Sequence, residues 1–439
     1  MSARETALNA LIACRKKEAW SNSVLKQYIA RDKLDRREAA LATRLCYGVL
    51  QNRERLDFYL KQLLTGKLKD LHPVVRDILH LGLYQLYELD KIPDSAAVNE
   101  SVDLAKKYCR WQRGAAGLVN GVLRSASRTQ GTLKEPRSFV DIYSHPQALV
   151  DLLIQDLGKE KTKIMLEADN TAPNTVIQVN TLRTTTEALC AELEWAGVKA
   201  EPHSWMSDCL VLSGTGDLEK LRAFQDGLFY VQDAAAKLTV MCAQVPKSSS
   251  THVLDCCAAP GGKSLAAAIA MGNAGKIRSC DVHKHKLPLI EKGAQRLGLS
   301  CITVREQDAT QPHPAWENKM DVVLCDVPCS GYGIIRKKPD IRYKDPMEME
   351  LLPQLQLQIL QQQANYVKPG GILIYSTCTV LRRENEEVVQ EFLEQHPDFE
   401  LEKLPLPSGL PENESGMLTL VPGEYDTDGF FISRLRRKA

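Results

Sequence analysis

The chain has 439 residues, 44% of them hydrophobic and 25% charged, which is typical of folded proteins with two or three domains and excludes disorder as the main state. No run approaches the roughly 20 apolar residues of a membrane helix, and charged residues between Met1 and Trp20 interrupt the apolar core that a signal peptide needs. Thirteen scattered cysteines without an export signal indicate reduced thiols, so we expect a cytoplasmic protein that does not bind membranes.

Residues 1–140 are predicted to form an all-α domain, because apolar residues such as Leu41, Leu45 and Val49 recur at steps of three and four. This segment has 25 Lys and Arg against 15 Asp and Glu, whereas the rest of the chain has 31 against 40. The net charge of +1 therefore conceals a basic first segment, which favours binding to a polyanion. A solvated helical face would produce the same charge pattern.

The remainder is predicted to contain two further domains. Residues 141–235 mix short strand patterns with helical ones, which indicates a small α+β domain. Residues 236–439 alternate short β-rich runs with helical segments, which is typical of an α/β fold with a doubly wound, Rossmann-like parallel sheet. In such sheets ligands bind outside the carboxyl ends of the strands.

The first strand pattern of this sheet runs into a turn of small residues. A cofactor can approach the backbone there, because Gly261 and Gly262 have no side chain and the following helix offers free N–H groups. The spacing matches neither a P-loop nor G-x-G-x-x-G, which disfavours a nicotinamide site. The candidate cofactor-binding residues of the turn are Cys257, Ala258, Ala259, Pro260, Gly261, Gly262 and Lys263.

Two aspartates follow the next two strand patterns. Asp281 comes about 20 residues after the turn, where a carboxylate commonly binds ribose hydroxyls. Asp308 follows the strand after that and is expected to meet an adenine edge. Alone, each is more typical of a surface loop or a helix cap, but an ordered series after consecutive strands favours a cofactor site.

Two further strand ends each carry a thiol, in the segments Asp326-Val327-Pro328-Cys329 and Ser376-Thr377-Cys378. Such a set suits methylation of cytosine carbon 5. A thiolate that adds to carbon 6 makes carbon 5 nucleophilic, a carboxylate or protonated group near ring nitrogen 3 stabilises the adduct, and a second base removes the carbon 5 proton. This chemistry alone does not decide which cysteine attacks.

Other uses of these cysteines remain open. A cysteine is far more often a small buried hydrophobe than a nucleophile. A zinc site would need C-x-x-C pairs or nearby histidines, and the sequence has no C-x-x-C, so we expect no metal. A redox disulfide between the two loops is a further alternative.

The motifs resemble those of the RNA cytosine-5 methyltransferases of the Nol1/Nop2/Sun group, through the turn Cys257–Lys263 and the two cysteine segments. The resemblance implies S-adenosylmethionine as the cofactor and Cys378 as the nucleophile. It also implies that Cys329 assists product release. Lys263 and Asp326 are expected to lie at the target base, and we count both among the cofactor-site residues as well.

The first domain resembles the NusB-like helical domain, through segments such as 81–86, 96–102 and 119–124. Its fusion to this catalytic domain is the arrangement of a bacterial family member that methylates a cytosine of 16S rRNA. Two positions depart from the family pattern: Val327 stands where Ala is usual, and Gln178 where Arg is common. Neither removes a group from the mechanism, although Gln178 is expected to alter RNA contacts slightly.

A segment of cations and tyrosines follows the Pro-Cys motif and is predicted to contact RNA, because cations suit phosphates and tyrosines stack on unpaired bases. Its residues are Tyr332, Arg336, Lys337, Lys338, Arg342, Tyr343 and Lys344. Since carbon 5 in a duplex is out of reach, the target cytosine should be single-stranded or extruded.

The sequence therefore predicts an S-adenosylmethionine-dependent enzyme that methylates carbon 5 of a cytosine in 16S rRNA that is unassembled or incompletely assembled. One alternative is the same chemistry on tRNA. Another is a non-catalytic, NusB-like RNA-binding factor, against which the intact set of Cys378, Cys329 and Asp326 argues.

Overall fold

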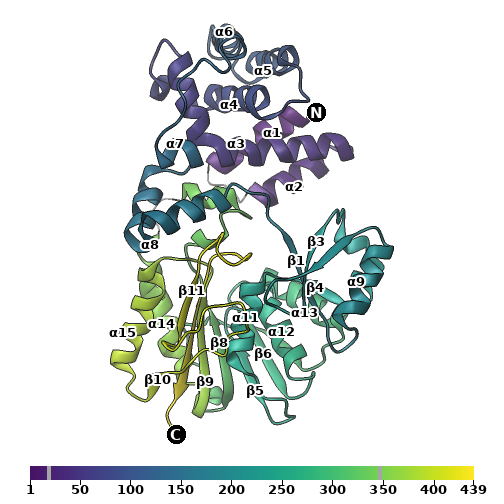
Figure 1. The fold of residues 1–439 in the computed structure, drawn as a ribbon, viewed down its shortest axis with the longest axis vertical. Coiled ribbons are helices and arrows are strands. Elements are labelled where there is room, and N and C mark those ends of the chain that lie inside the picture. The colour runs from purple at the N-terminus through teal and green to yellow at the C-terminus, as the bar shows by residue number, and fades with distance from the viewer. Residues whose placement is uncertain (17–20, 345–348) are drawn as a thin grey trace. The chain divides into compact units, whose positions relative to one another are not determined.

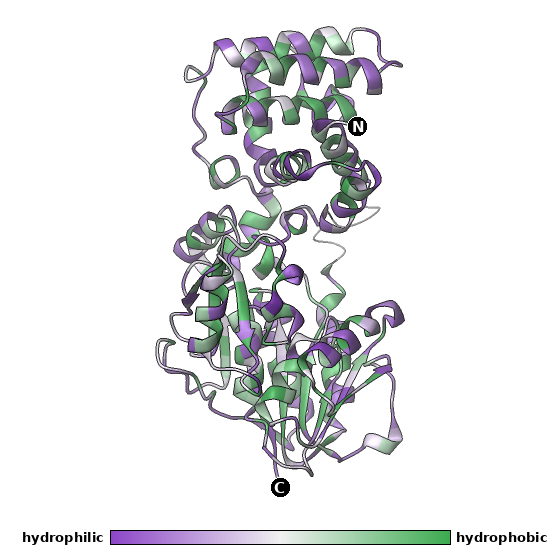
Figure 2. Ribbon diagram, turned by 90° about the vertical axis from the view of Figure 1, so that its right-hand side faces the viewer, coloured by the Kyte–Doolittle hydropathy of each residue, from purple (hydrophilic) through white to green (hydrophobic). Residues whose placement is uncertain are grey.

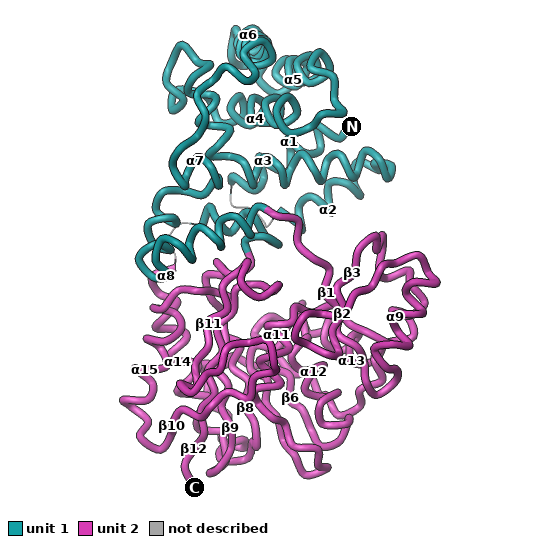
Figure 3. The backbone as a smooth tube through the Cα atoms, in the orientation of Figure 1, with its two compact units in different colours: residues 1–170, 335–344 teal, residues 171–334, 345–439 magenta. Residues whose placement is uncertain are grey.

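The computed structural model describes residues 1–16, 21–344 and 349–439. It divides the chain into two compact units (Figure 3). Unit 1 comprises residues 1–170 and 335–344, and unit 2 comprises residues 171–334 and 345–439. The chain therefore leaves unit 2 shortly after the Pro-Cys motif, contributes ten residues to unit 1, and returns.

Unit 1 is helical, as predicted. Its α-helices are α1 (Ala3–Arg15), α2 (Ser21–Arg31), α3 (Arg36–Leu63), α4 (Pro73–Glu88), α5 (Asp94–Tyr108), α6 (Ala115–Arg128), α7 (Phe139–Tyr143) and α8 (Gln147–Ala168), with 3-10 helices η1 (Leu68–Asp70) and η6 (Pro339–Tyr343). The longest, α3, begins where the Asp35 side chain accepts the backbone N–H groups of Arg37 and Glu38. Its buried Leu45 belongs to a core that includes Ile78 of α4.

Helices α7 and α8 belong to unit 1, so the boundary predicted at residue 140 differs from this division. The backbone shows why. Ser144, between the two helices, accepts the N–H of Glu54 in α3 at 3.0 Å through its Oγ, which ties this segment to the first helices. The residues that follow the predicted boundary, up to Asn170, are thus part of the same unit.

The first part of unit 2 is a small antiparallel sheet with strand order β2-β3-β1-β4. Its elements are β1 (Thr175–Val179), α9 (Thr186–Trp195), β2 (Lys199–Pro202), β3 (Cys209–Ser213), η2 (Leu218–Lys220), α10 (Arg222–Gln225) and β4 (Phe229–Val231). Leu189 and Leu193 of α9 pack with Ile177 and Phe229 in the core of this sheet. The predicted small α+β domain is therefore present.

The second part of unit 2 is an eight-stranded sheet with the order β10-β12-β9-β8-β5-β6-β7, in which β11 also pairs with β12 (Figure 1). Its strands are β5 (His252–Asp255), β6 (Lys276–Asp281), β7 (Ile302–Glu306), β8 (Met320–Asp326), β9 (Val367–Thr377), β10 (Phe399–Leu401), β11 (Met417–Leu420) and β12 (Phe430–Arg437). Strands β5 to β9 are parallel. The chain starts at β5, moves outward to β7 and then returns to β8, so the strand order reverses between β5 and β8, where ligands bind in such sheets.

Helices cover both faces of this sheet, which makes it doubly wound as predicted. They are α11 (Ala234–Ala243), α12 (Gly262–Ala270), α13 (Leu287–Leu297), α14 (Leu352–Ala364) and α15 (Glu386–Gln395), with 3-10 helices η3 (Lys284–Lys286), η4 (Pro314–Trp316), η5 (Tyr332–Ile334) and η8 (Arg382–Glu384).

Alternation along β8 shows the two faces. Val322 and Leu324 pack in the core with α11 to α13, while Val323 and Cys325 pack with α14 and α15. The strands are accordingly mostly hydrophobic along their length (Figure 2). Among the described residues, no helix is both long enough and apolar enough to cross a membrane.

Candidate active site

The glycine turn lies at the carboxyl end of β5, and its backbone fits a closely approaching ligand. Gly261 has a φ of +114°, a conformation that favours glycine, and an added Cβ there would lie 3.2 Å from Ile290. At Gly262 an added Cβ would lie 2.7 Å from Nε2 of Gln232. Helix α12 begins at Gly262, so its first N–H groups lie at the end of the turn.

Asp281, at the end of β6, is joined to this turn. Its Oδ2 accepts the N–H of Ala259 at 3.1 Å, and its Oδ1 accepts that of His283 at 2.9 Å. The side chain is buried to 7% exposure, so the carboxylate is fixed beside the turn. The structure thus brings two parts of the predicted cofactor site together.

Asp308 follows β7 at the same edge of the sheet but is exposed. Its Oδ1 accepts both the N–H and the Oγ1 hydroxyl of Thr310, at 2.9 and 2.8 Å. Within the described part of the chain its carboxylate makes no hydrogen bond to the glycine turn. Its adenine-binding role remains a prediction.

Lys263 and Asp326 form an ion pair with Nζ 2.6 Å from Oδ2, although they are 63 positions apart in the chain. Lys263 is buried in α12, and its Nζ also lies 4.9 Å from the centre of the Phe430 ring. The Ser376 hydroxyl donates to Oδ1 of Asp326 at 3.0 Å. Both carboxylate oxygens of Asp326 are therefore engaged, and Ser376 joins the loop of Cys378 to that of Cys329.

The two candidate cysteines meet. Their Sγ atoms are 3.4 Å apart, and both are half-buried thiols that form no disulfide in the described part of the chain. The hydrogen bond with Cys378, and after it burial, raises the pKa of the Cys329 thiol well above its usual range. When one of the two sulfurs is ionised, the other therefore keeps its proton.

Sequence analysis did not single out Asp255, the last residue of β5, which is 0% exposed. Its Oδ2 accepts the Ser264 hydroxyl at 2.7 Å, while Oδ1 has no hydrogen-bond partner among the described residues. Burial raises its pKa to about 7. Its position between a buried strand and the glycine turn is the sequence feature that could have marked Asp255 as a candidate site residue.

Three residues of the segment after the Pro-Cys motif do not have the predicted role. Arg342 is 1% exposed and donates to the carbonyl groups of Gln51 and Ser144, each at 2.9 Å. Tyr343 donates to the carbonyl of Leu50 at 3.0 Å, and Tyr332 is 1% exposed. The prediction that these three bind phosphates or stack on bases is wrong, because Arg342 and Tyr343 bond inside the protein and Tyr332 is buried.

Gln178 is likewise 0% exposed, and its Nε2 donates to the carbonyl of Gln232 at 3.0 Å. It is therefore not available to contact RNA, and the expectation of altered RNA contacts at this position is wrong. Gln232 in turn lies against Gly262, so Gln178 supports the residue that borders the glycine turn. The other departure, Val327, is buried in the sheet core.

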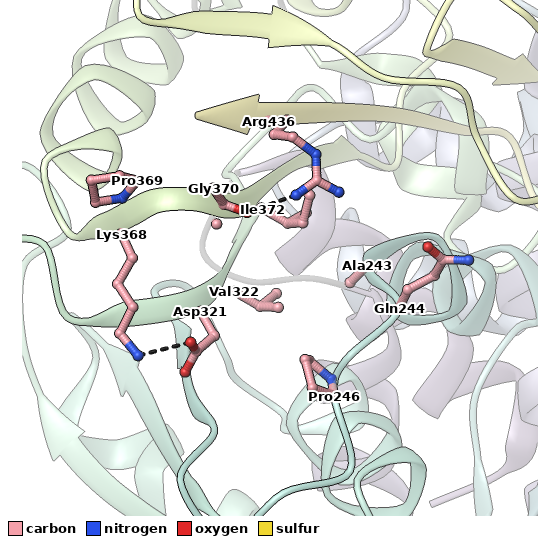
Figure 4. Close-up of a pocket in the computed structure, with 11 residues that line it drawn as sticks. Ala243, Gln244, Pro246, Asp321, Val322, Lys368, Pro369, Gly370, Ile372 and Arg436 are labelled. Atoms are coloured by element: carbon pink, nitrogen blue, oxygen red, sulfur yellow. Dashed lines mark hydrogen bonds and ion pairs between the residues drawn. The ribbon is translucent and has the colours of Figure 1, made fainter. Parts of the chain in front are cut away.

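A cavity of about 230 Å³ lies at the opposite edge of the sheet (Figure 4). Its cations are already paired: Lys368 Nζ lies 2.7 Å from Asp321, and Arg436 binds Glu402 and the Gly370 carbonyl. Because Asp321 lies at the amino end of its parallel strand, the cavity is remote from the ligand-binding edge. Among the described residues, no group of three or more His, Cys, Asp and Glu side chains is arranged to hold a metal ion.

Comparison with known proteins identifies the family. A model of the 16S rRNA methyltransferases RsmB/F matches residues 242–436, the NusB family matches residues 1–128, and the ferredoxin-like domain of RsmF/B-like methyltransferases matches residues 145–219. A probable ribosomal RNA small subunit methyltransferase B from Bacillus subtilis (strain 168) is 40% identical over 449 residues, covering 100% of this chain and 99% of its own. The chain belongs to the RsmB/F family.

A further relative and a solved structure are similar to the chain over most of its length. A ribosomal RNA small subunit methyltransferase B from Escherichia fergusonii is 34% identical over 410 residues, covering 92% of each chain. The crystal structure of the protein PH0851 is 26% identical, has a TM-score of 0.80 and covers 98% of both chains. As an RsmB/F family member, the protein is an rRNA small subunit methyltransferase whose fold combines a NusB region, a ferredoxin-like domain and a methyltransferase sheet, which confirms the predicted resemblance and fold class.

Proposed function

We propose that the protein transfers a methyl group from S-adenosylmethionine to carbon 5 of a cytosine in 16S rRNA, with Cys378 as the nucleophile. The observation that carries this proposal is the pair of Sγ atoms 3.4 Å apart beside the Lys263–Asp326 ion pair. A thiolate, a second thiol and a charged pair at one strand edge are the groups that this reaction requires.

The cofactor site is supported by the backbone of the turn. The glycine cradle would be filled by any side chain, and the unpartnered Oδ1 of Asp255 is a buried acceptor at its base. Both fit a ligand that carries an ammonium group and a ribose. The residues that would hold it are those of the turn 257–263, with Asp281, Asp308 and Asp326. When bound, S-adenosylmethionine supplies an electrophilic methyl group.

The chain's own residues supply the remaining steps. The Cys378 thiolate forms a bond to carbon 6, and the Lys263–Asp326 pair stabilises the charge that moves onto the ring. Carbon 5, now nucleophilic, takes the methyl group. Cys329 then removes the carbon 5 proton, and the electron pair left at carbon 5 expels the Cys378 thiolate, which restores the enzyme and the aromatic base.

The pKa pattern of the thiols suits this order. While Cys378 is a thiolate, its hydrogen bond holds the proton on Cys329. Once Cys378 is bonded to carbon 6, it carries no charge, and the largest cause of the raised pKa of Cys329 is removed. Cys329 then releases its own proton to solvent more easily, which leaves a thiolate as the base that takes the carbon 5 proton.

For the RNA we propose 16S rRNA that is unassembled or incompletely assembled. Unit 1 offers a surface for single-stranded RNA around Trp111, which is 59% exposed and lies against His72 with ring centres 4.1 Å apart and the ring planes tilted by 60°. Arg110 and Arg113 are its neighbours in the chain and are exposed. An exposed aromatic ring with cations close to it in the chain suits an unpaired base and its phosphates.

Incubation with methyl-labelled S-adenosylmethionine and three RNAs tests the proposal: protein-free 16S rRNA, assembled small subunits and tRNA. We expect label in 5-methylcytosine of the free 16S rRNA only. Label in tRNA alone would show that the substrate is tRNA and not 16S rRNA. No label in any RNA, with binding of 16S rRNA intact, would indicate a non-catalytic RNA-binding factor.

A further inference from the structure

Two adjacent buried residues outside the predicted site, Glu384 and Asn385, connect the loops of both cysteines. Glu384 is the last residue of η8, and Asn385 directly precedes α15. Both side chains are 0% exposed. The mechanism proposed above assigns neither of them a role.

Asn385 binds the residues on both sides of Cys378. Its Oδ1 accepts the Thr377 hydroxyl at 2.6 Å, and its Nδ2 donates to the Thr379 carbonyl at 3.1 Å. One amide therefore holds the residue before and the residue after the candidate nucleophile. Thr377 and Thr379 are both 0% exposed, so water does not substitute for these bonds.

Glu384 contacts the residues on both sides of Cys329 in a similar way. Its Oε2 accepts the N–H of Ser330 at 2.8 Å and the Nε2 of Gln356 at 2.9 Å. Gln356 donates from the same Nε2 to the Pro328 carbonyl at 2.9 Å. The Glu384 carboxylate thus holds both neighbours of Cys329: it binds Ser330 directly, and it binds Pro328 through the Gln356 amide.

Helix capping does not account for Asn385. Asparagine at the residue before a helix usually accepts an N–H of the first turn, but the Asn385 side chain makes no such bond to α15. The amide points to the Cys378 loop instead. A cross-link between the loops completes the arrangement, because the Ser330 hydroxyl donates to Oγ1 of Thr379 at 2.8 Å.

We propose that Glu384 and Asn385 are positioning residues that fix the two cysteines relative to each other, with Asn385 serving the attack by Cys378 and Glu384 serving the release by Cys329. This inference rests on the proposed covalent mechanism. The two side chains act through different loops. Loss of Asn385 should therefore slow formation of the protein–RNA adduct, whereas loss of Glu384 should slow its breakdown.

The test uses the full chain with protein-free 16S rRNA and labelled S-adenosylmethionine, and it measures methyl transfer in a single turnover and adduct on a denaturing gel. Asn385→Ala and Thr377→Val probe the Cys378 side, and Glu384→Ala and Gln356→Met probe the Cys329 side. Thr377→Val and Gln356→Met preserve side-chain volume and keep the test decisive if an alanine variant does not fold. Glu387→Gln, an exposed change on α15, is the matched control.

We expect Asn385→Ala and Thr377→Val to lower the rate of adduct formation roughly 10- to 100-fold, as a small misplacement of a reacting group does. Glu384→Ala and Gln356→Met should accumulate adduct above the level of the unchanged protein while product release falls. Glu387→Gln should match the unchanged protein, and S-adenosylmethionine affinity should be the same in all five.

Two results would overturn the inference: rates within twofold of the unchanged protein for Thr377→Val and Gln356→Met, or a parallel loss of adduct and product on both sides, as a general structural defect would cause. Failure of the underlying mechanism looks different. In that case Cys378→Ala would still methylate RNA, or Cys329→Ala would form no adduct.

Discussion

Replacing Asp255 with Asn should stabilise unit 2 increasingly as the pH rises. Burial raises the pKa of Asp255 from its usual 3.8 to about 7. Between these two values the unfolded chain has released the proton and the folded protein has not, so stability falls as the pH rises towards 7. Above that pH both states are ionised and the full cost of burying the charge is present.

The size of this cost follows from the shift. About three pKa units at about 1.4 kcal/mol each give an upper bound of about 4 kcal/mol at alkaline pH. Between pH 5 and pH 8 the stability of the unchanged protein should fall relative to Asp255→Asn by up to about 3 kcal/mol. Asn still accepts the Ser264 hydroxyl, which bonds to Oδ2 at 2.7 Å in the unchanged protein, so the pH-independent part of the difference should be small.

Urea unfolding of both proteins at pH 5 and pH 8 measures this difference, and pulsed hydrogen exchange of peptides from β5 and β8 assigns the transition to unit 2. Titration with S-adenosylmethionine should show weaker binding by Asp255→Asn, because the unpartnered Oδ1 becomes an amide. If the difference in stability between the two proteins is the same at both pH values, the argument that ionisation of the buried Asp255 destabilises the folded protein is refuted.

Three further predictions concern other parts of the chain. Cys378→Ala should abolish methyl transfer to 16S rRNA, while Cys329→Ala should retain attack and trap an adduct visible as a slow band on a denaturing gel; equal effects of the two changes would contradict the assigned order. Arg342→Met should destabilise unit 1 by about 3–5 kcal/mol in urea unfolding, since it removes a buried cation and leaves carbonyl acceptors unsatisfied, whereas the exposed Lys338→Met should change stability by less than about 0.5 kcal/mol. Trp111→Ala should weaken binding of single-stranded RNA by about 1–3 kcal/mol in a fluorescence titration, and an unchanged affinity would remove Trp111 from the RNA surface.

The sequence was sufficient to predict that the candidate side chains lie together, because a parallel sheet brings all its strand ends to one edge. Cys329 and Cys378 are 49 positions apart, yet each follows a buried apolar strand, and β8 and β9 are neighbours. Lys263 and Asp326 meet for the same reason, since β5 also pairs with β8. Strand periodicity predicts where each strand ends, and the parallel topology places the ends of neighbouring strands close together.

The residues that escaped sequence analysis are those whose role depends on what is packed against them. Arg342 has the appearance of a surface cation in a basic run, and only the carbonyl groups of Gln51 and Ser144 around it reveal a buried anchor. Asn385 directly precedes a helix, where a cap is the ordinary expectation, but its amide bonds to the Cys378 loop. Local pattern identifies the candidate reactive residues. The residues proposed to position them become visible only when each buried polar group is matched to its partner.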